Sequence, residues 1–319
     1  MKKSRKFKKI LITGVNGSVG SYLFEYLNKK KLKTFGFYRT KKNFKYLNKF
    51  NEKFLIKLDL NNFKLTKKKI SSLKPDLIFH LASNADVRSS FDNPRDIIIN
   101  NNNCTLNLLE ACRLASSKAL IIISSTSEVY GSPKTKKISE KNKIAPNNIY
   151  AVSKTFQDFL AQNYYKIYGL NIIITRMFTY LNARRDNLFA SAWAKQIVKI
   201  EKGEKKFLEH GNLNSYRSIM NINDAIEAYW LTALKGRVGE IYNIGAGQNI
   251  KLKKFLEKLI KISKVKIHTK INKKYLRKTD IKKQIPDSSK FKIQTGWKNK
   301  KDFNNNLKNF LEEVRKNSS

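Results

Sequence analysis

The sequence is poor in several residue types, and each scarcity excludes a class of protein. Its 319 residues include two cysteines, three histidines and five prolines. Two cysteines are too few for a secreted domain that is stabilised by several disulfides. The histidines are scattered and no Cys/His cluster has the spacing of metal ligands, so we expect no metal. Cys104 and Cys112 fall eight residues apart in one predicted helix, about 12 Å along its axis, so we expect buried thiols rather than a disulfide.

Long apolar runs are missing as well. None approaches the roughly 18 residues of a membrane span, so we expect no membrane partner. The first nine residues are basic like the start of a signal peptide, but only Ile10-Leu11-Ile12 follows before Thr13 and Gly14. That segment is too short for the apolar core of a signal peptide. We therefore expect a cytoplasmic protein.

Acidic residues are scarce: 24 Asp and Glu stand against 66 Lys and Arg, which gives a formal net charge of +42. Such a charge is typical of proteins that bind nucleic acid or another anionic surface. The lysines are spread along the whole chain, however, and Asn, Ile and Phe are abundant too. These residues share A/T-rich codons, so genome composition explains the charge more simply, and we expect no nucleic-acid partner. The charge would still attract a nucleotide diphosphate.

Short apolar runs alternate with helical patterns over the first half of the chain. The expected strands are Lys9–Thr13, Leu32–Tyr38, Phe54–Leu58, Asp76–His80, Ala119–Ser124 and Leu170–Thr175. The expected helices are Ser18–Asn28, Phe63–Ser72, Pro94–Ala115 and Tyr150–Tyr168, with a polar loop at Ala82–Asn93. In the third helix we expect a core face of Ile98, Leu106, Leu109, Ala111 and Leu114. The alternation predicts an α/β fold with a Rossmann-type, doubly wound parallel sheet.

After Arg176 the pattern loosens, which indicates a smaller, interleaved C-terminal substrate lobe over the carboxyl edge of the sheet. We expect a polar loop at Phe178–Asp186, a strand at Glu240–Asn243 and a turn at Gly245–Gly247, with helices at Leu188–Glu201, Ile222–Leu234, Lys251–Ile262 and Leu307–Val314. The cofactor domain would comprise residues 1–177 and about 218–243, and the lobe residues 178–217 and 244–319.

A glycine motif follows the first expected strand. Thr13 to Gly20 reads Thr-Gly-Val-Asn-Gly-Ser-Val-Gly and opens a helix. Glycine there permits a tight turn and close approach of a pyrophosphate, which a helix N-terminus favours. We expect Gly14, Asn16, Gly17, Val19 and Gly20 to contact a dinucleotide; the alternative is an ordinary strand-to-helix turn.

The end of the second expected strand decides between two cofactors. NAD sites usually carry an acid there for the ribose 2′-hydroxyl. This chain has Tyr38-Arg39-Thr40-Lys41-Lys42 and no acid. Arg39 can accept a 2′-phosphate, so we predict NADP, unless Arg39 is only one more basic surface residue. Asp59-Leu60, after the third strand, would meet the adenine.

Two segments near the middle of the chain could place four reactive groups around one substrate. Thr126 and Glu128 are two residues apart at the end of a strand, so they face the same side if the extended geometry persists. Tyr150 and Lys154 are four apart on one helix face. An ammonium close to a phenol lowers the phenol's pKa and gives a base usable near neutral pH.

These motifs resemble the extended short-chain dehydrogenase/reductase family, also called the NAD-dependent epimerase/dehydratase family, over nearly the whole chain. Within it, they are similar to the branch that dehydrates GDP-mannose. The more specific matches are the Thr-Ser-Glu segment at Thr126–Glu128, the pair Arg184-Arg185 and the Gly-Asn-Leu-Asn-Ser segment at Gly211–Ser215. The glycine motif and the Tyr150/Lys154 pair identify only the superfamily.

The resemblance implies conversion of GDP-mannose to GDP-4-keto-6-deoxymannose by internal hydride transfer from C4 to C6. Tyr150 would take the 4-hydroxyl proton, and Lys154 would hold the nicotinamide ribose. Glu128 would remove the C5 proton and help to expel the 6-hydroxyl, while Thr126 polarises the 4-oxygen. The implied alternatives are a GDP-4-keto-6-deoxymannose reductase or another nucleotide-sugar epimerase or dehydratase. A remote alternative is a non-catalytic Rossmann protein that binds polyanions.

The resemblance also implies binding residues for a nucleotide-sugar substrate. Arg184, Arg185 and Arg217 would grip the diphosphate, and Arg277 and Asp280 would contact phosphate and guanosine ribose. Each arginine could instead be a surface charge. The remaining positions are the sugar contacts Ser83 and Asn182, the further substrate contacts Thr179 and Lys195, and the cofactor contacts Leu81, Ala82 and Ser83. His80 is expected to be packed or hydrogen-bonded rather than catalytic.

The chain departs from the family pattern in places that bear on assembly. Thr179 stands where members often have asparagine, and Ala183 replaces a proline. The segment after Arg39 is shorter and lacks the serine-rich arm that in the family reaches a neighbouring subunit's cofactor. We therefore expect a homodimer through the helices after Asn93 and Tyr150, with a tetramer as the alternative.

Overall fold

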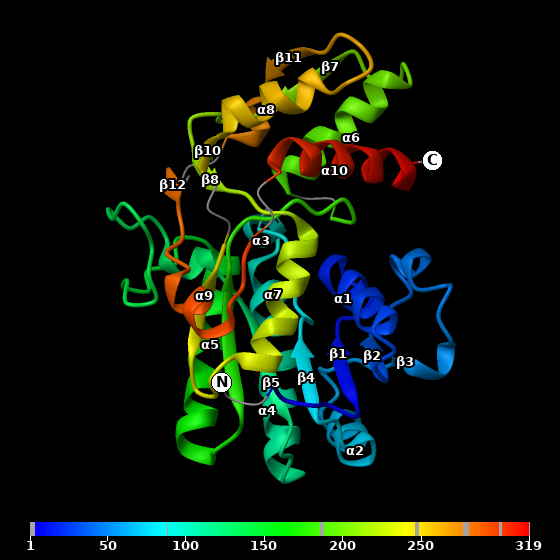
Figure 1. Cartoon of the computed structure of the whole chain (residues 1–319), viewed down its shortest axis with the longest axis vertical. Coiled ribbons are helices and arrows are strands. Elements are labelled where there is room, and N and C mark those ends of the chain that lie inside the picture. The colour runs from blue at the N-terminus through cyan, green and yellow to red at the C-terminus, as the bar shows by residue number, and fades with distance from the viewer. Residues whose placement is uncertain are drawn as a thin grey trace.

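A seven-stranded parallel sheet forms the base of the molecule (Figure 1). The computed structural model describes residues 4–87, 89–185, 188–245, 249–276, 281–299 and 302–318. The sheet has the order β3-β2-β1-β4-β5-β6-β9, with every neighbouring pair parallel. Its strands are β1 (Ile10–Thr13), β2 (Thr34–Tyr38), β3 (Leu55–Lys57), β4 (Leu77–His80), β5 (Leu120–Thr126), β6 (Ile172–Met177) and β9 (Ile241–Ile244). The predicted doubly wound α/β sheet is confirmed.

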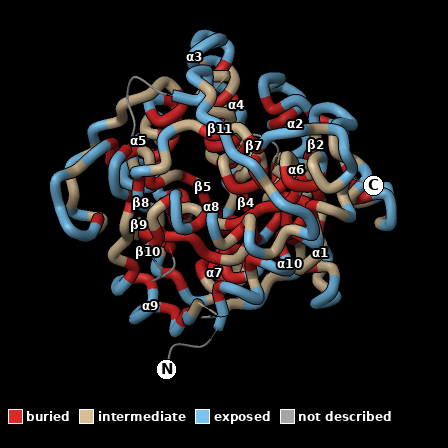
Figure 2. Tube along the Cα trace, turned by 90° about the horizontal axis from the view of Figure 1, so that it is seen from above, coloured by how far each residue is buried: buried red, intermediate tan, exposed pale blue. Residues whose placement is uncertain are grey.

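The central strands are apolar on both faces because helices cover both faces. Helices α1 (Ser18–Lys29) and α7 (Ile222–Lys235) pack on one side in a cluster that includes Ile12 and Phe79. Helices α2 (Phe63–Leu73), α4 (Pro94–Leu114) and α5 (Ile149–Tyr168) pack on the other side around Leu11 and Ile78. Figure 2 shows buried segments at β4, β5 and α7, in the centre of the molecule.

A second layer of structure lies over the carboxyl ends of the strands, at the top of Figure 1. Helices α6 (Phe189–Glu201), α8 (Leu252–Lys261) and α10 (Phe303–Asn317) share an apolar core there, with Phe255 and Leu311 fully buried. Two small sheets, which the sequence did not predict, have the orders β10-β8-β12 and β11-β7. Their strands are β7 (Phe207–His210), β8 (Tyr216–Ser218), β10 (Asn249–Lys251), β11 (His268–Ile271) and β12 (Lys283–Gln284). The division of the chain into two domains stays a prediction.

Several predicted bounds were wrong. The expected polar loop at Ala82–Asn93 contains a short helix, α3 (Ser89–Asp92), and α10 begins four residues before Leu307. The unpredicted helix α9 (Ser289–Thr295) returns to the main sheet, where Phe291 packs in the cluster of α1 and α7. Gly245 is described, whereas the rest of the turn expected at Gly245–Gly247 lies outside the described residues.

The predicted core face of α4 was only partly right. Leu109 and Ala111 are fully buried, but Leu106 is 38% and Leu114 42% exposed, and Ile98 is half-buried. The buried stripe instead contains Ile97, Asn101, Cys104, Thr105, Leu108 and Cys112. Small and polar side chains belong to this stripe because α2 and α5 pack closely on α4, and a search for apolar residues alone misses them. Both cysteines are free and buried, as predicted.

None of the helices in the described part of the chain combines the length and the apolar character that crossing a membrane requires.

Candidate active site

The glycine turn between β1 and α1 brings backbone close to backbone. Gly14 has a φ of +68°, and a Cβ there would lie 2.8 Å from the Cα of Ala82. A Cβ on Gly20 would lie 2.2 Å from the carbonyl oxygen of Gly14. The cap residue of α1, Gly17, brings no side chain to the helix N-terminus, whose first N–H groups therefore suit an anion. These features fit the pyrophosphate of a dinucleotide.

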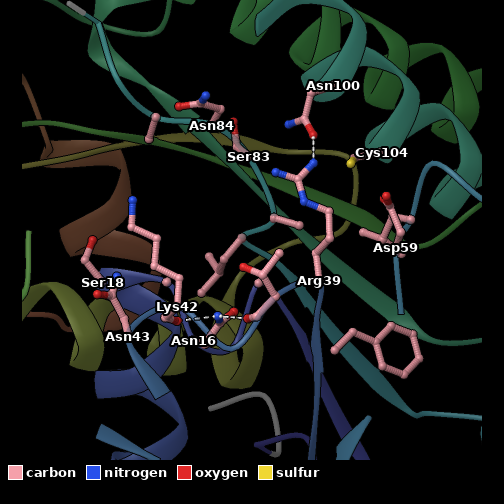
Figure 3. Close-up of a pocket in the computed structure, with 18 of the residues that line it drawn as sticks. Asn16, Ser18, Arg39, Lys42, Asn43, Asp59, Ser83, Asn84, Asn100 and Cys104 are labelled. Carbon is pink, nitrogen blue, oxygen red and sulfur yellow. Dashed lines mark hydrogen bonds between the residues drawn. The ribbon is translucent and has the colours of Figure 1, made fainter. Parts of the chain in front are cut away.

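A first cavity of about 470 Å³ runs from this turn along the ends of β2 and β4 (Figure 3). Asn16 donates from Nδ2 to the carbonyls of Thr40 and Lys42, at 2.7 Å each, and so ties the loop after β2 to the turn. Arg39 donates to Oδ1 of Asn100 at 2.7 Å. The expected cofactor residues that line this cavity are Gly14, Asn16, Gly17, Arg39, Asp59, Leu60, Leu81, Ala82 and Ser83.

A second cavity of about 230 Å³ continues from the first toward β5 and α5. Both cavities are lined by Gly14, Gly17, Ser83 and Arg185, so together they form one elongated site. The Oγ of Ser83 is buried and has no hydrogen-bond partner in the described ranges, as expected of a group that contacts a ligand. Further expected residues that line the second cavity are Val19, Gly20, Thr126, Glu128, Tyr150, Lys154, Thr179 and Arg217.

Thr126 and Glu128 reach the second cavity by a different route from the one predicted. Thr126 ends β5, and Ser127–Tyr130 forms a 3₁₀ turn, so the extended geometry does not persist. The turn instead begins with a cap, because the N–H of Glu128 donates to Oγ1 of Thr126 at 3.3 Å. The Thr126 side chain also lowers the pKa of the Tyr150 phenol.

Asn148 connects the Glu128 carboxylate to the start of α5, and the sequence prediction missed it. Its Oδ1 accepts the N–H of Ala151 at 2.8 Å, which caps the helix. Its Nδ2 donates to Oε2 of Glu128, also at 2.8 Å. Asn is a strong cap residue, so its place just before Ile149 and Tyr150 was the available signal.

Burial has the largest effect on the pKa values of Tyr150 and Lys154, the expected catalytic pair. Burial raises the pKa of Tyr150 above its ordinary value, Glu128 raises it further, and Arg185 lowers it. Of the nearby charges, Arg185 opposes the effect of burial most strongly. The lowering of the Tyr150 pKa by the Lys154 ammonium stays a prediction. Burial lowers the pKa of Lys154 to about 8, against the opposing effect of Asp158.

A buried ion pair joins α5 to the sheet. Arg176 on β6 donates from Nε and Nη2 to the carboxylate of Asp158 at 2.9 and 3.0 Å. Ser125 donates to the same carboxylate at 2.8 Å, and Nη1 of Arg176 donates to the hydroxyl of Tyr130. These bonds fix α5 against β5, β6 and the turn that carries Glu128.

His80 is packed and hydrogen-bonded, as predicted. Its ring nitrogens lie 2.9 Å from the hydroxyls of Thr13 and Thr105, and only 2% of the residue is exposed. Burial, with a smaller effect of Lys154, lowers the pKa of His80 to about 3, so the ring stays neutral. Within the described ranges, no group of three or more His, Cys, Asp or Glu residues is arranged to hold a metal ion.

The two arginines expected at the substrate diphosphate, Arg184 and Arg185, lie in different surroundings. The Arg184 guanidinium lies 3.7 Å from the ring centroid of Tyr22 and 4.5 Å from that of Tyr46, and donates to Glu25 at 2.9 Å. Arg184 lines the first cavity but not the second, so its predicted role at the substrate diphosphate disagrees with its position. Arg185 lines both cavities.

Some of the other residues expected to bind substrate line the two cavities and some do not. Asn182 is fully buried and accepts the N–H of Arg184, and neither Asn182 nor Lys195 is among the described residues that line the two cavities. Arg217 lines the second cavity and donates to the carbonyl of Ile281 at 2.8 Å. Arg277 and Asp280 lie outside the described residues.

Comparison with known proteins gives the family. The profile of the GDP-mannose 4,6 dehydratase family matches residues 11–310. An uncharacterised protein of Methanocaldococcus jannaschii, MJ1055, is 30% identical, and the match covers 96% of this chain and 95% of that protein. GDP-mannose 4,6 dehydratase 1 of Arabidopsis thaliana is 29% identical over 95% of this chain and 88% of that protein.

Solved structures show the same fold. RMD from Pseudomonas aeruginosa complexed with NADPH aligns with a TM-score of 0.82 at 23% identity, over 97% of this chain and 99% of that chain. DesIV, a dTDP-glucose 4,6-dehydratase from Streptomyces venezuelae with NAD and TYD bound, aligns with a TM-score of 0.85 at 21% identity, over 97% of both chains. The fold and the site define an enzyme of the extended short-chain dehydrogenase/reductase class, whose members use a nicotinamide cofactor. This chain belongs to the GDP-mannose 4,6-dehydratase family.

Proposed function

We propose that this enzyme converts GDP-mannose to GDP-4-keto-6-deoxymannose and uses NADP. The observation that carries the proposal is the position of Glu128, which lines the same cavity as Tyr150 and Thr126 and is held there by Asn148. A reductase needs a phenol and a lysine but no carboxylate beside them. A dehydratase needs a group that moves a proton between C5 and the leaving 6-hydroxyl, and a carboxylate can do this.

The side chains of this cavity would divide the proton transfers between them. When bound, a nicotinamide would supply the redox chemistry, which is the transfer of hydride from C4 to C6 without net oxidation. Tyr150 accepts the proton of the 4-hydroxyl, and the Thr126 hydroxyl donates to the 4-oxygen. Glu128 then takes the C5 proton, which the 4-ketone has made acidic, and donates a proton to the 6-oxygen as it leaves as water. Once hydride is back on C6, C5 takes up a proton, which balances the one that Tyr150 accepted from the 4-hydroxyl.

Two of the cations would support these transfers. Arg185 favours the phenolate of Tyr150, because it lowers a pKa that burial raises. Lys154 lines the cavity one helical turn beyond Tyr150, where it would hold the nicotinamide ribose. Cofactor and sugar would exclude water from these groups and so strengthen both effects.

Product mass and cofactor state test the reaction. Incubation of the enzyme with GDP-mannose and NADP⁺ is expected to give a product lighter by one water, with no net NADPH. Glu128→Gln should bind cofactor and GDP-mannose as the wild type does but lose dehydration by about 100-fold or more, the scale of a general acid–base contribution. Turnover of only a 4-keto sugar with NADPH would instead identify a reductase, and an unimpaired Glu128→Gln variant would remove Glu128 from the mechanism.

Arg39 supports NADP as the cofactor. It lines the first cavity at the end of β2, where an acid would select NAD. Because a guanidinium binds a 2′-phosphate through charge-assisted hydrogen bonds, Arg39→Ala should weaken NADP binding about 10- to 100-fold and NAD binding much less. Calorimetry with both cofactors measures this, and Arg95→Ala, an exposed arginine on α4, is the control. An equal loss for both cofactors would contradict the assignment.

A further inference from the structure

A buried amide at the wall of the second cavity has no acceptor among the residues that the structure describes. Gln284 ends β12 and is 4% exposed, and it lines the second cavity. Its Nε2 is buried and has no hydrogen-bond partner within the described parts of the chain. A buried amide without a partner loses its bonds to water and destabilises the fold, so its presence at a cavity wall points to a bond made with a ligand.

The neighbours of Gln284 indicate which kind of ligand it meets. β12 pairs with β8 in parallel, and Gln284 lies opposite Arg217, which lines the same cavity. Arg217 is held by the carbonyls of Tyr216 and Ile281, at 2.9 and 2.8 Å. Among the described residues of this cavity, Glu128 is the only acid, and Asn148 already holds it. A cation and an amide donor on adjacent strands therefore face a space that an anion would fill.

The order of groups along the site identifies that anion. The glycine turn stands at one end of the two cavities, and Tyr150 and Glu128 lie beyond it. Arg217 and Gln284 reach the second cavity from the small sheet above the main one. A nucleotide sugar that places its hexose at Tyr150 and Glu128 must extend away from the cofactor, toward this small sheet.

We propose that Gln284 is a substrate-binding residue, whose amide donates a hydrogen bond to an oxygen of the substrate diphosphate beside Arg217. The proposal rests on the proposed function, because it takes the substrate to be a nucleotide sugar. It also explains why a buried strand position holds a polar side chain: the amide has no partner among the described residues of the free chain, and the bound diphosphate would supply one.

Gln284→Leu should change ligand affinity and stability in opposite directions, which distinguishes a binding role from a structural one. The variant removes the unsatisfied amide at similar volume, so its melting temperature should rise by about 1–3 °C. Its affinity for GDP and for GDP-mannose should fall about 10- to 100-fold, because a hydrogen bond to a charged group is lost. NADP affinity should not change, since Gln284 does not line the first cavity. Calorimetry with GDP, UDP, dTDP and GDP-mannose measures the binding.

Two more variants complete the experiment. Gln284→Glu keeps the shape but replaces the amide by a carboxylate, so it should bind nucleoside diphosphates more weakly than Gln284→Leu does. Gln294→Leu, which changes an exposed glutamine on α9 that donates to the carbonyl of Lys235, should bind all ligands as the wild type does.

Other outcomes would overturn the proposal. Unchanged affinity of both Gln284 variants for nucleoside diphosphates would remove Gln284 from the site. Weaker binding of GDP-mannose with unchanged binding of GDP would place Gln284 at the hexose and contradict the diphosphate contact. If the wild type binds UDP or dTDP and not GDP, the proposed substrate is wrong, and Gln284 is judged with the nucleotide that binds. A wild type that binds none of the nucleotides overturns both proposals.

Discussion

Asn148 holds two functional elements with one side chain. Its oxygen caps α5, which begins at the next residue, Ile149, and its nitrogen donates to the Glu128 carboxylate. The position of the carboxylate therefore depends on the same residue that caps α5. A substitution that keeps the cap but changes the group facing Glu128 separates these two roles.

Asn148→Asp and Asn148→Ser provide that separation. Both side chains can cap α5, so both variants should fold. In Asn148→Asp, two carboxylates lie side by side and cannot both ionise readily, so the acid limb of the pH–rate profile should move to higher pH by about one unit or more. Asn148→Ser loses the contact without adding charge, so its rate should fall while its profile keeps the wild-type shape. Coincident profiles for Asn148→Asp and the wild type would contradict the positioning role.

The buried ammonium of Lys154 should lower the free energy of unfolding, although the proposed reaction needs it. In the unfolded chain a lysine keeps its proton up to about pH 10.4, whereas burial lowers the pKa of Lys154 in the folded enzyme to about 8. Between these values the unfolded state binds more protons, so wild-type stability rises with pH, and below pH 8 the full penalty is present. Lys154→Met should therefore raise the free energy of unfolding at pH 7 by about 1–3 kcal/mol and abolish turnover.

Urea unfolding at pH 7 and pH 9.5 measures this effect. The advantage of Lys154→Met over the wild type should shrink at the higher pH. Lys166→Met, an exposed lysine on the same helix, should show no comparable gain. A Lys154→Met enzyme that is no more stable than the wild type at pH 7 would show that the buried ammonium has compensating partners.

At the scale of elements, the predictions that held depend on local spacing. The turn between β1 and α1 and the Tyr150/Lys154 pair are short motifs whose geometry is fixed by the next few residues. The partners of Arg184 could not be predicted in this way, because Tyr22 and Tyr46 are far from it in sequence. The burial of Asn101 depends likewise on Ser153 of the packed helix α5, to which its amide donates.

Helices α4 and α5 pack side by side and expose apolar side chains. On α5, Val152, Phe156 and Phe159 are 42%, 40% and 46% exposed and share one face of the helix. On α4, Ile99 and Leu106 are 40% and 38% exposed and seven residues apart. We propose that a second copy of the chain covers these faces, which would complete a four-helix interface in a homodimer.

Phe156→Lys tests this interface. Burial of a charge without a partner at the interface, opposed by its symmetry mate, should convert the dimer to a monomer. Light scattering after size-exclusion chromatography measures the mass. Ile293→Lys on α9, where the side chain is 86% exposed, is the control and should leave the mass unchanged. A monomeric wild type, or a Phe156→Lys variant that stays dimeric, would contradict the proposed interface.

At the scale of the whole molecule, the fold surrounds one elongated site. The sheet supplies the glycine turn and the strand ends, α5 supplies Tyr150 and Lys154, and the layer above supplies Arg217 and Gln284. The sequence predicted the sheet because strand and helix periods alternate along the chain. It did not predict the small sheets above, because they pair short strands, such as β8 and β12, that are distant in sequence and carry little periodicity.

Deuterium placed on C4 of GDP-mannose tests the internal hydride transfer most directly. The enzyme, unlabelled NADP⁺ and GDP-[4-²H]mannose should give a product that is lighter by one water and carries the deuterium on C6, without net NADPH. Nuclear magnetic resonance locates the label, and mass spectrometry shows the loss of water. Deuterium found in released NADPH, or a product that keeps its 6-hydroxyl, would contradict a dehydratase.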